Sequence, residues 1–460
     1  MSRYTSATDA DREEMLAAIG VSSIDDLFAD IPAAVRFDRP LDLPEGKPEQ
    51  EVYAYLRDLA ARNVSAEDEL TFLGAGMYDH YVPALVDHIT TRSEFLTPYT
   101  PYQPEISQGN LQVMFEYQTM ISELTGLPVS NASVYEGPSA LAAAGWLAKL
   151  HTGRSRFVCS RGVHPHSRET LATTAAGWEM SIDEVGLADG VTDLGALGSA
   201  LSDDVAAVFV GYPNFLGAVE DLDAIVAAAR EHGALVIAQC DPIALGVLRT
   251  PGEAGVDIAV GEGQPLGNRL DYGGPSFGFF AAQEAYLRKM PGRIAGETTD
   301  VDGRRGFVLT LQTREQHIRR EKATSNICTA QALNALAGTI YLSWLGREGL
   351  VELGELLLQR TAYARDALAA LDGVTLLHEQ PVVREFALRL DAPVEAVIER
   401  CHAEAVNPGF VLGREYSEFG DGLLVALTEQ RSRADIDRLV SVLGAAVAAE
   451  RVGSTAGVSA

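Results

Sequence analysis

Apolar runs of five to eight residues recur between residues 156 and 281, separated by segments that repeat apolar residues at helical spacing. The runs lie at 156–160, 205–212, 234–240, 256–260 and 276–281. They lack the polar alternation of a half-exposed strand, so they predict strands that are buried on both faces. Helices are expected at 111–125, 140–150 and 221–232. Repeated strand and helix units of this kind predict a doubly wound, mostly parallel sheet.

The pattern differs on both sides of this region. Short helical patterns and a proline-rich stretch without visible chemistry predict an N-terminal helical and extended arm over residues 1–95. Residues 96–330 are predicted to form the large α/β domain, in which the stretch 295–307, rich in Gly, Thr and Arg, is expected to be a loop. A long amphipathic helix at 351–371 and the strand patterns after it predict a small C-terminal α+β domain over residues 331–460.

The composition is that of a soluble globular protein, with 47% hydrophobic and 22% charged residues among 460. No apolar run approaches the roughly 20 residues that span a bilayer. The first residues are acidic where a signal peptide would be basic. We therefore expect a cytoplasmic protein. A formal net charge of -28 argues against partners that are nucleic acids or anionic membranes.

The numbers of lysines and cysteines bear on the source and the cellular compartment. Four lysines stand among 36 basic residues, and this acid excess suits a protein kept soluble in concentrated salt, which is a hypothesis of a halophilic source. The four cysteines are scattered without metal-ligand spacing, at positions 159, 240, 328 and 401. A reduced compartment and no metal site are therefore expected.

The end of the run 234–240 carries the first candidate for chemistry. Asp241 and Pro242 follow it directly, at the strand edge where open α/β sheets bind ligands. A second buried run, a Gly-rich loop ending in Gly-Gly-Pro and a third run come next. This layout resembles the pyridoxal phosphate enzymes of fold type I, which are similar to aspartate aminotransferase. In that class an Asp contacts the pyridine nitrogen and a Lys on the following loop forms the Schiff base.

Asp241 matches the Asp of that layout, but the Lys is missing. On the loop between Val260 and Tyr272, Gln264 or Pro265 falls near the place where the amine would be. The lysines of the whole chain are elsewhere, at Lys47, Lys149, Lys289 and Lys322. The site is therefore predicted to lack its covalent anchor. An ordinary strand end with a Gly-rich turn is the plainer alternative.

Two further stretches fit the same class of site. The turn that carries Glu136, Gly137 and Ser139 precedes an Ala-rich helix and could hold a phosphate on free backbone N–H groups, or simply cap the helix. His164 and His166 follow the strand 156–160, where this fold type often stacks an aromatic ring on the cofactor. A zinc site is disfavoured because no third ligand is evident.

Two loops could contribute to a site from outside the sheet. Three prolines among residues 98–104 fix an extended loop that displays Tyr99, Tyr102 and Glu105, although such a composition also suits a packed linker. Ser325 and Asn326 precede the helical pattern that starts at Ala330, and Asn326 could also serve as its cap.

Several longer blocks resemble the glycine cleavage system P-protein family, specifically subunit 1, the α-type chain of the two-subunit glycine dehydrogenase (decarboxylating). The blocks that carry the resemblance are 97–109, 116–119, 133–139, 271–275 and 321–331. The resemblance covers nearly the whole chain, and the first and last blocks are long enough to be specific.

The resemblance implies a chain that works with a homologous subunit 2, as an α2β2 heterotetramer. It implies that pyridoxal 5'-phosphate is bound covalently by subunit 2, that glycine is decarboxylated there, and that the aminomethyl group passes to the lipoyl group of H-protein. Tyr99, Tyr102, Glu105, Ser325 and Asn326 would then reach the partner's site. A degenerate pocket of this chain's own would consist of Glu136, Gly137, Ser139, His164, His166, Asp241 and Gln264.

Two other functions are compatible with these residues. The chain could be a self-sufficient pyridoxal phosphate enzyme, such as an aminotransferase, with its lysine displaced to Lys289 or Lys322. It could also be a non-catalytic regulatory homologue that binds a partner.

Overall fold

The computed structural model describes residues 6–37, 39–324, 327–328 and 330–457, with side chains to Val452. These residues form two compact units, 1–64 and 65–460, which are described separately. The expected arm boundary at residue 95 stays a prediction, and the structure groups the part of the arm after residue 64 with the second unit. Residues 65–95 belong to the second unit, because strand β1 (Leu70–Thr71) pairs with β15 (Val406–Asn407) and helix α3 (Ala84–Thr90) packs on the long helix α11.

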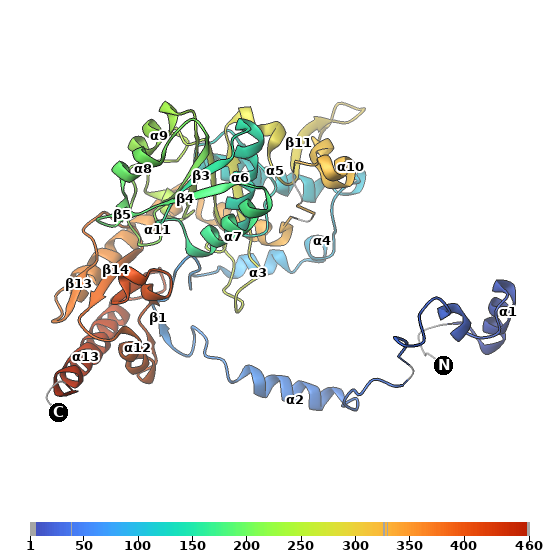
Figure 1. Cartoon of the computed structure of the whole chain (residues 1–460), viewed down its shortest axis with the longest axis horizontal. Coiled ribbons are helices and arrows are strands. Elements are labelled where there is room, and N and C mark those ends of the chain that lie inside the picture. Colours follow the sequence, from blue (N-terminus) through green and yellow to red (C-terminus); the bar gives the residue numbers. More distant parts are fainter. Residues whose placement is uncertain (1–5, 38, 325–326, 329, 458–460) are drawn as a thin grey trace. The chain divides into compact units, whose positions relative to one another are not determined.

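The first unit contains two helices and a short 3-10 turn, namely α1 (Asp9–Ile19), η1 (Asp25–Phe28) and α2 (Glu49–Ala60) (Figure 1). Helix α1 begins at Thr8, whose side chain and that of Asp11 cap each other's backbone N–H groups. It ends at Gly20, whose φ of 87° suits glycine. None of the described side chains of this unit is buried. The arm therefore has no hydrophobic core of its own.

The second unit is built on a seven-stranded sheet in the order β2-β10-β9-β8-β7-β3-β4. The strands are β2 (Val129–Ser130), β3 (Arg156–Ser160), β4 (Ser181–Val185), β7 (Val205–Tyr212), β8 (Leu235–Cys240), β9 (Ile258–Glu262) and β10 (Gly278–Ala282). Within this sheet only β10 runs antiparallel to its neighbours. The predicted α/β class with a mostly parallel sheet is thereby confirmed.

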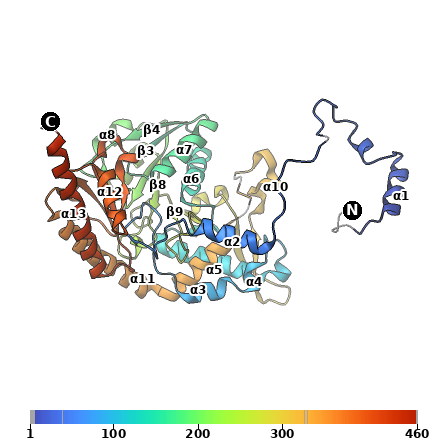
Figure 2. The same ribbon diagram turned by 90° about the horizontal axis from the view of Figure 1, so that it is seen from below.

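Helices cover both faces of this sheet (Figure 2). They are α5 (Gln108–Thr125), α6 (Gly137–Thr152), α7 (Pro165–Gly177), α8 (Leu194–Ala200) and α9 (Leu222–Glu231). Successive side chains of β3 enter different hydrophobic clusters, because Phe157 packs with α6 and α7 while Val158 packs with α5 and α9. The sheet is thus buried on both faces, as its apolar runs indicate.

A four-stranded antiparallel sheet in the order β13-β14-β17-β16 follows at the C-terminal end. Its strands are β13 (Val374–Leu376), β14 (Glu385–Leu390), β16 (Phe410–Val411) and β17 (Gly422–Ala426), and its helices are α11 (Ala332–Ala369), α12 (Val394–Ala403) and α13 (Arg433–Gly457). Helices α12 and α13 lie side by side (Figure 2). Element α11 consists of two helical stretches that meet in a kink at Gly346, whose φ of 61° and ψ of -175° are not helical. A domain boundary near residue 330 stays a prediction.

The stretch expected to be a loop at 295–307 is instead part of a β-hairpin. Strands β11 (Ile294–Thr299) and β12 (Arg305–Thr310) pair antiparallel along six residues each. Phe307 and Leu309 pack against α5, while the outer residues stay polar. Because one face of the hairpin is polar and its strands contain glycines, the sequence lacks the continuous apolar run that predicts the other strands.

Shorter elements complete the unit: α4 (Ser93–Leu96), η2 (Pro104–Ile106), β5 (Leu187–Ala188), β6 (Val191–Thr192), η3 (Ala244–Gly246), η4 (Glu284–Lys289), η5 (Gln312–Arg314), α10 (Gln316–Arg319), η6 (Arg320–Lys322), η7 (Leu412–Arg414) and η8 (Ser417–Phe419). No helix within the described residues is both long and apolar enough to cross a lipid bilayer.

Candidate functional site

A cavity of about 80 Å³ lies at the carboxyl edge of the large sheet. Its walls include His164 after β3, Asn214 after β7, Asp241 after β8 and Glu262 at the end of β9, with Arg384 contributed from the segment before β14. Parallel strands bring their carboxyl ends to one edge, which is why residues distant in sequence meet here. The cavity is far below the roughly 300 Å³ at which ligand pockets begin.

Asp241 is fully engaged by a residue that the sequence did not point to. Arg384 donates from Nε to one carboxylate oxygen at 2.5 Å and from Nη2 to the other at 2.6 Å. The exposed fractions of the two side chains are 4% for Arg384 and 14% for Asp241. Burial by itself would lower the pKa of Arg384, but Asp241, Tyr78 and Glu385 outweigh it and the pKa is raised. The guanidinium therefore stays charged and occupies the acceptor oxygens of Asp241.

Tyr78 fills the space beside this ion pair. Its ring lies under the Arg384 guanidinium, with 3.4 Å between the carbon Cζ and the ring centroid. Its hydroxyl donates to Glu385 at 2.6 Å. Burial and the Glu385 carboxylate raise the pKa of Tyr78 well above its usual value, so the phenol remains protonated. An aromatic ring and a guanidinium of the chain itself thus stack within the cavity.

Gln264, which stands near the expected lysine position, holds the backbone of Tyr78. Its side-chain oxygen accepts the Tyr78 N–H at 2.9 Å, and its amide nitrogen donates to the Tyr78 carbonyl at 3.0 Å and to the Asn268 carbonyl at 2.9 Å. Three satisfied hydrogen bonds explain why an amide is buried here with 1% exposure. A residue with both a donor and an acceptor suits this position better than an amine.

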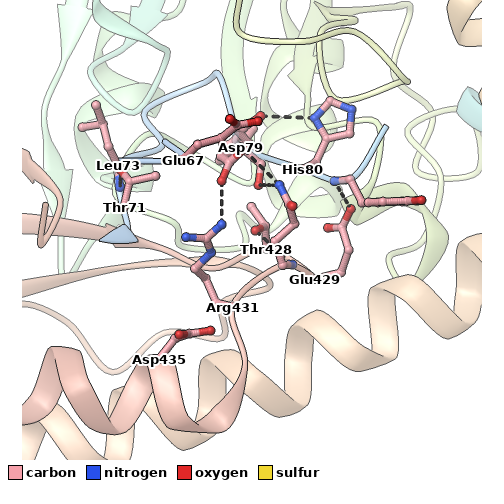
Figure 3. A network of polar contacts seen from close by, with 12 residues as sticks. Glu67, Thr71, Leu73, Asp79, His80, Thr428, Glu429, Arg431 and Asp435 are labelled. Atoms are coloured by element: carbon pink, nitrogen blue, oxygen red, sulfur yellow. Dashed lines mark hydrogen bonds and ion pairs between the residues drawn. The ribbon is translucent and has the colours of Figure 1, made fainter. Parts of the chain in front are cut away.

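The residues after Tyr78 are fastened to the C-terminal part of the chain (Figure 3). Asp79 accepts from Arg431 at 2.5 Å, and Glu429 accepts the Tyr81 N–H at 2.6 Å. His80 accepts the Gly267 N–H on Nε2 at 3.2 Å, so its proton is on Nδ1 and faces the Tyr78 carbonyl at 3.1 Å. Burial lowers the pKa of His80 to about 4. The segment 78–81 is therefore fixed in place over the cavity.

The first turn of α6, where a phosphate could bind, is taken by carboxylates. Glu136 caps the helix by accepting the Ser139 N–H at 3.0 Å, and Glu262 accepts the Gly137 N–H at 3.0 Å. Ser276 also donates its hydroxyl to Glu262. Burial raises the pKa of Glu262, while these hydrogen bonds oppose the rise. A Cβ on Gly137 would lie 3.1 Å from the Glu262 nitrogen, so Glu262 is packed directly on the turn.

The remaining predicted residues are distributed as follows. His164 lines the cavity and its Nε2 contacts the Ala75 carbonyl at 2.8 Å, and burial lowers its pKa to about 4. His166 is exposed beside it. Tyr99 and Glu105 are exposed on the proline-rich loop, where 78% of Tyr99 is accessible. Ser325 and Asn326 lie outside the described residues.

Tyr78, Arg384, Glu385 and Glu262 are the residues of this site that sequence reasoning missed or undervalued. Arg384 and Glu385 lie 143 or more residues from Asp241 along the chain, and no local pattern marks their meeting. Glu262 is the residue of this group that the sequence itself could have marked as incompatible with phosphate binding. A carboxylate two residues before the expected amine, at a strand end, is unusual in a phosphate-binding pocket.

These residues do not fit pyridoxal phosphate. The cofactor needs a lysine amine, a carboxylate free to contact its ring nitrogen, and unoccupied donors for its phosphate. Here Gln264 stands near the amine position, Asp241 is held by Arg384, and the Gly137 N–H is held by Glu262.

No lysine is among the described residues that line the cavity. Lys289 donates to the Leu150 carbonyl at 3.0 Å. Leu150 is 13 residues beyond Gly137 on α6, which places it about 20 Å along the helix from the site. Lys149, from the same end of α6, donates to the Trp178 carbonyl. Lys322 is exposed in η6, and Lys47 belongs to the arm.

Metal chemistry also lacks a visible site. Among the residues with described positions, no group of three or more His, Cys, Asp or Glu side chains could hold a metal ion. All four cysteines are free thiols.

The sheet order and the solved structures that match identify the fold as fold type I, the fold of the pyridoxal phosphate enzymes described above. A glutamate decarboxylase of Lactobacillus brevis superposes with a TM-score of 0.70 at 13% identity, over 91% of this chain and 97% of that one. A sphingosine-1-phosphate lyase of Burkholderia pseudomallei gives a TM-score of 0.64 at 16% identity, over 93% and 97%. At such identities the likeness establishes the fold alone.

Closer relatives determine the family. The family model described as glycine cleavage system P-protein matches residues 2–443. The probable glycine dehydrogenase (decarboxylating) subunit 1 of Geobacillus kaustophilus is 50% identical over 442 residues, which cover 96% of this chain and 98% of the relative. The protein so described from Bacillus subtilis is 49% identical with the same coverage. This chain therefore belongs to the glycine cleavage system P-protein family, as the sequence blocks indicated.

A solved structure supports the same assignment. It is described as glycine decarboxylase (P-protein) of the glycine cleavage system in inhibitor-bound form. It superposes with a TM-score of 0.87 at 44% identity and covers 97% of this chain and 100% of that one. The similarity therefore extends through both the large and the small sheet.

Proposed function

We propose that this chain is the subunit of a two-subunit glycine decarboxylase that does not carry the cofactor. Pyridoxal 5'-phosphate is bound covalently by the homologous subunit 2, glycine loses its carboxyl group there, and the aminomethyl group passes to the lipoyl group of H-protein. In this proposal the present chain completes and shapes the partner's site. Its own strand-edge cavity serves as a structural core.

The observation that carries the proposal is the filled cavity. Asp241 is bound by Arg384, Tyr78 occupies the space beside them, and Glu262 occupies the first turn of α6. Each contact satisfies a group that a cofactor would need. The names of the relatives, subunit 1 of a glycine dehydrogenase, agree with a partner that supplies what is missing.

The proline-rich loop is the proposed contribution to the partner's site. Its tyrosines, Tyr99 and Tyr102, expose 78% and 43% of their surfaces. Large aromatic side chains at this exposure bury substantial apolar area when a partner covers them. Glu105 on the same loop is exposed too, and we propose that Ser325 and Asn326 also contribute to the partner's site.

The two other functions receive less support. A self-sufficient enzyme needs an amine at the cavity, and Lys289 is bonded near the far end of α6. A non-catalytic regulatory homologue is the remaining alternative. It predicts that subunit 2 alone performs the whole reaction.

The test is exchange between the carboxyl group of glycine and labelled bicarbonate, with lipoylated H-protein present. We expect exchange when this chain and subunit 2 are combined, and background exchange with either chain alone. Full activity of subunit 2 alone would favour the regulatory homologue. Activity of this chain alone would favour the self-sufficient enzyme.

We further propose an α2β2 heterotetramer that works in a cytoplasm of high salt concentration. The net charge of -28 and the scarcity of lysine support the saline setting, because salt screens repulsion between surface carboxylates. Sedimentation of the mixed subunits at increasing KCl tests both ideas. A complex of other stoichiometry, or one that dissociates as salt rises, would contradict them.

A further inference from the structure

A buried arginine outside the cavity connects the proline-rich loop to the segment that precedes α11. Arg293, which directly precedes β11, is 5% exposed. Its Nη2 donates to the Tyr102 hydroxyl at 3.1 Å and to the Cys328 carbonyl at 2.5 Å. Its guanidinium carbon also lies 5.6 Å from the centroid of the Tyr102 ring. One side chain thus contacts two segments that are more than 200 residues apart in sequence.

The surroundings of Arg293 hold these two segments on a rigid base. The Arg293 carbonyl accepts the Ala132 N–H at 2.8 Å, next to the large sheet. Gln108, at the start of α5, bonds both the N–H and the carbonyl of Phe307 on the hairpin. The Tyr135 hydroxyl accepts the Cys328 N–H at 3.0 Å. The hairpin, α5 and the sheet therefore fix where Arg293 can point.

The cluster also includes a buried carboxylate. Glu315 is 6% exposed, and one of its oxygens lies 3.6 Å from Arg293 Nε and 3.5 Å from His317 Nδ1. Among the described residues, Arg293 Nε and the other Glu315 oxygen have no hydrogen-bond partner. A buried charge with such loose pairing is costly for stability alone. The arrangement points to a requirement other than stability.

We infer that Arg293 is a positioning residue for the reaction: it holds Tyr102 and the Cys328 segment as one block that this chain presents to the partner's site. This inference rests on the proposed function, in which these segments complete the site of subunit 2. Arg293 itself touches neither substrate nor cofactor. It acts through the placement of Tyr102.

A second arginine of equal burial supplies the matched control. Arg314 is 7% exposed and follows the same hairpin, but within the described part of the chain its guanidinium donates only to the backbone carbonyls of Met290, Gly292 and Leu311. It stabilises the same neighbourhood without touching Tyr102. An effect on catalysis that Arg293→Met shows and Arg314→Met does not must therefore come from the loop contacts.

The experiment uses the assembled two-subunit enzyme with H-protein and measures kcat and KM for glycine in the exchange assay. We expect Arg293→Met to lower kcat about 10- to 100-fold with a smaller change in KM, the size of loss that slight misplacement of reacting groups causes. Arg293→Lys should recover part of kcat, because one ammonium can reach Tyr102 or Cys328 but not both. Arg314→Met should lower the melting temperature while kcat stays within about twofold.

Hydrogen exchange of the chain gives a readout that does not depend on turnover. Residues 98–107 should exchange faster in Arg293→Met than in the parent, and at the parental rate in Arg314→Met. Unchanged exchange of this loop would overturn the positioning role even if the proposed function holds. Faster exchange with unchanged kcat would overturn it as well. Absence of activity in the parent pair would instead refute the proposed function.

Discussion

Replacing Arg384 by methionine tests whether the filled cavity stabilises the fold. The substitution removes the guanidinium and leaves the Asp241 carboxylate, 14% exposed, without its partner. Breaking a buried pair from one side costs about 3–5 kcal/mol, because the remaining charge is uncompensated. The lost stack on Tyr78, at 3.4 Å from the ring centroid, adds about 1 kcal/mol. We expect the apparent free energy of unfolding to fall by about 4–6 kcal/mol.

The assay is unfolding of the full chain in urea, monitored by circular dichroism. The free energy of unfolding should fall with urea concentration at the same slope in the parent and the variant. Arg389→Met is the matched control on β14, the strand that Arg384 directly precedes, since Arg389 pairs with Asp421 where both side chains are about 40% exposed. Exposed pairs contribute about 0–1 kcal/mol, so the control should lose little. Asp241→Asn combined with Arg384→Met should recover part of the loss. A loss below about 1 kcal/mol for Arg384→Met would refute the reasoning.

Three further predictions concern the cavity and the proline-rich loop. Gln264→Lys should not create a covalent pyridoxal adduct, because Tyr78 and Arg384 still fill the site; absorbance of an adduct at the new side chain would show that the missing amine was the only obstacle. Burial lowers the pKa of His80 from an ordinary 6.5 to about 4. As pH falls from 6.5 to 4, the unfolded chain binds a proton at His80 and the folded chain does not. The folded state therefore loses stability across this pH range. The lowered pKa corresponds to about 3 kcal/mol of stability lost between pH 6.5 and 4. His80→Gln should flatten this part of the stability curve, and an unaltered curve would contradict the assignment. Tyr99→Phe, and more strongly Tyr99→Ala, should lower exchange activity of the assembled enzyme while gel filtration shows the subunits still bound, whereas unchanged turnover would remove Tyr99 from the site.

The sequence predicts the buried part of the fold well, because burial on both faces leaves an uninterrupted apolar run. The bounds expected for β3 and β7 agree with the structure to the residue. The hairpin β11–β12 was missed for the opposite reason. One of its faces is polar, and its glycines and arginines resemble those of a loop.

The site was predictable where a residue's position alone defines its role. Asp241 directly follows a buried strand, and the absence of lysine from the loop is visible by inspection. The sequence could not predict which side chains occupy the site, because they are held by contacts between residues far apart in the chain. Tyr78 and Gln264, for example, are 186 residues apart. The sequence therefore indicates that the loop lacks an amine, but not which side chains contact Asp241 and the first turn of α6.

The most direct test of the central claim is to incubate this chain alone with pyridoxal phosphate, reduce it with borohydride and locate pyridoxyl groups by mass spectrometry. The chain contains four lysines, so each can be examined. We expect no stoichiometric label on any of them, and after assembly we expect the label on subunit 2. A pyridoxyl group held stoichiometrically by a lysine of the isolated chain would contradict the account.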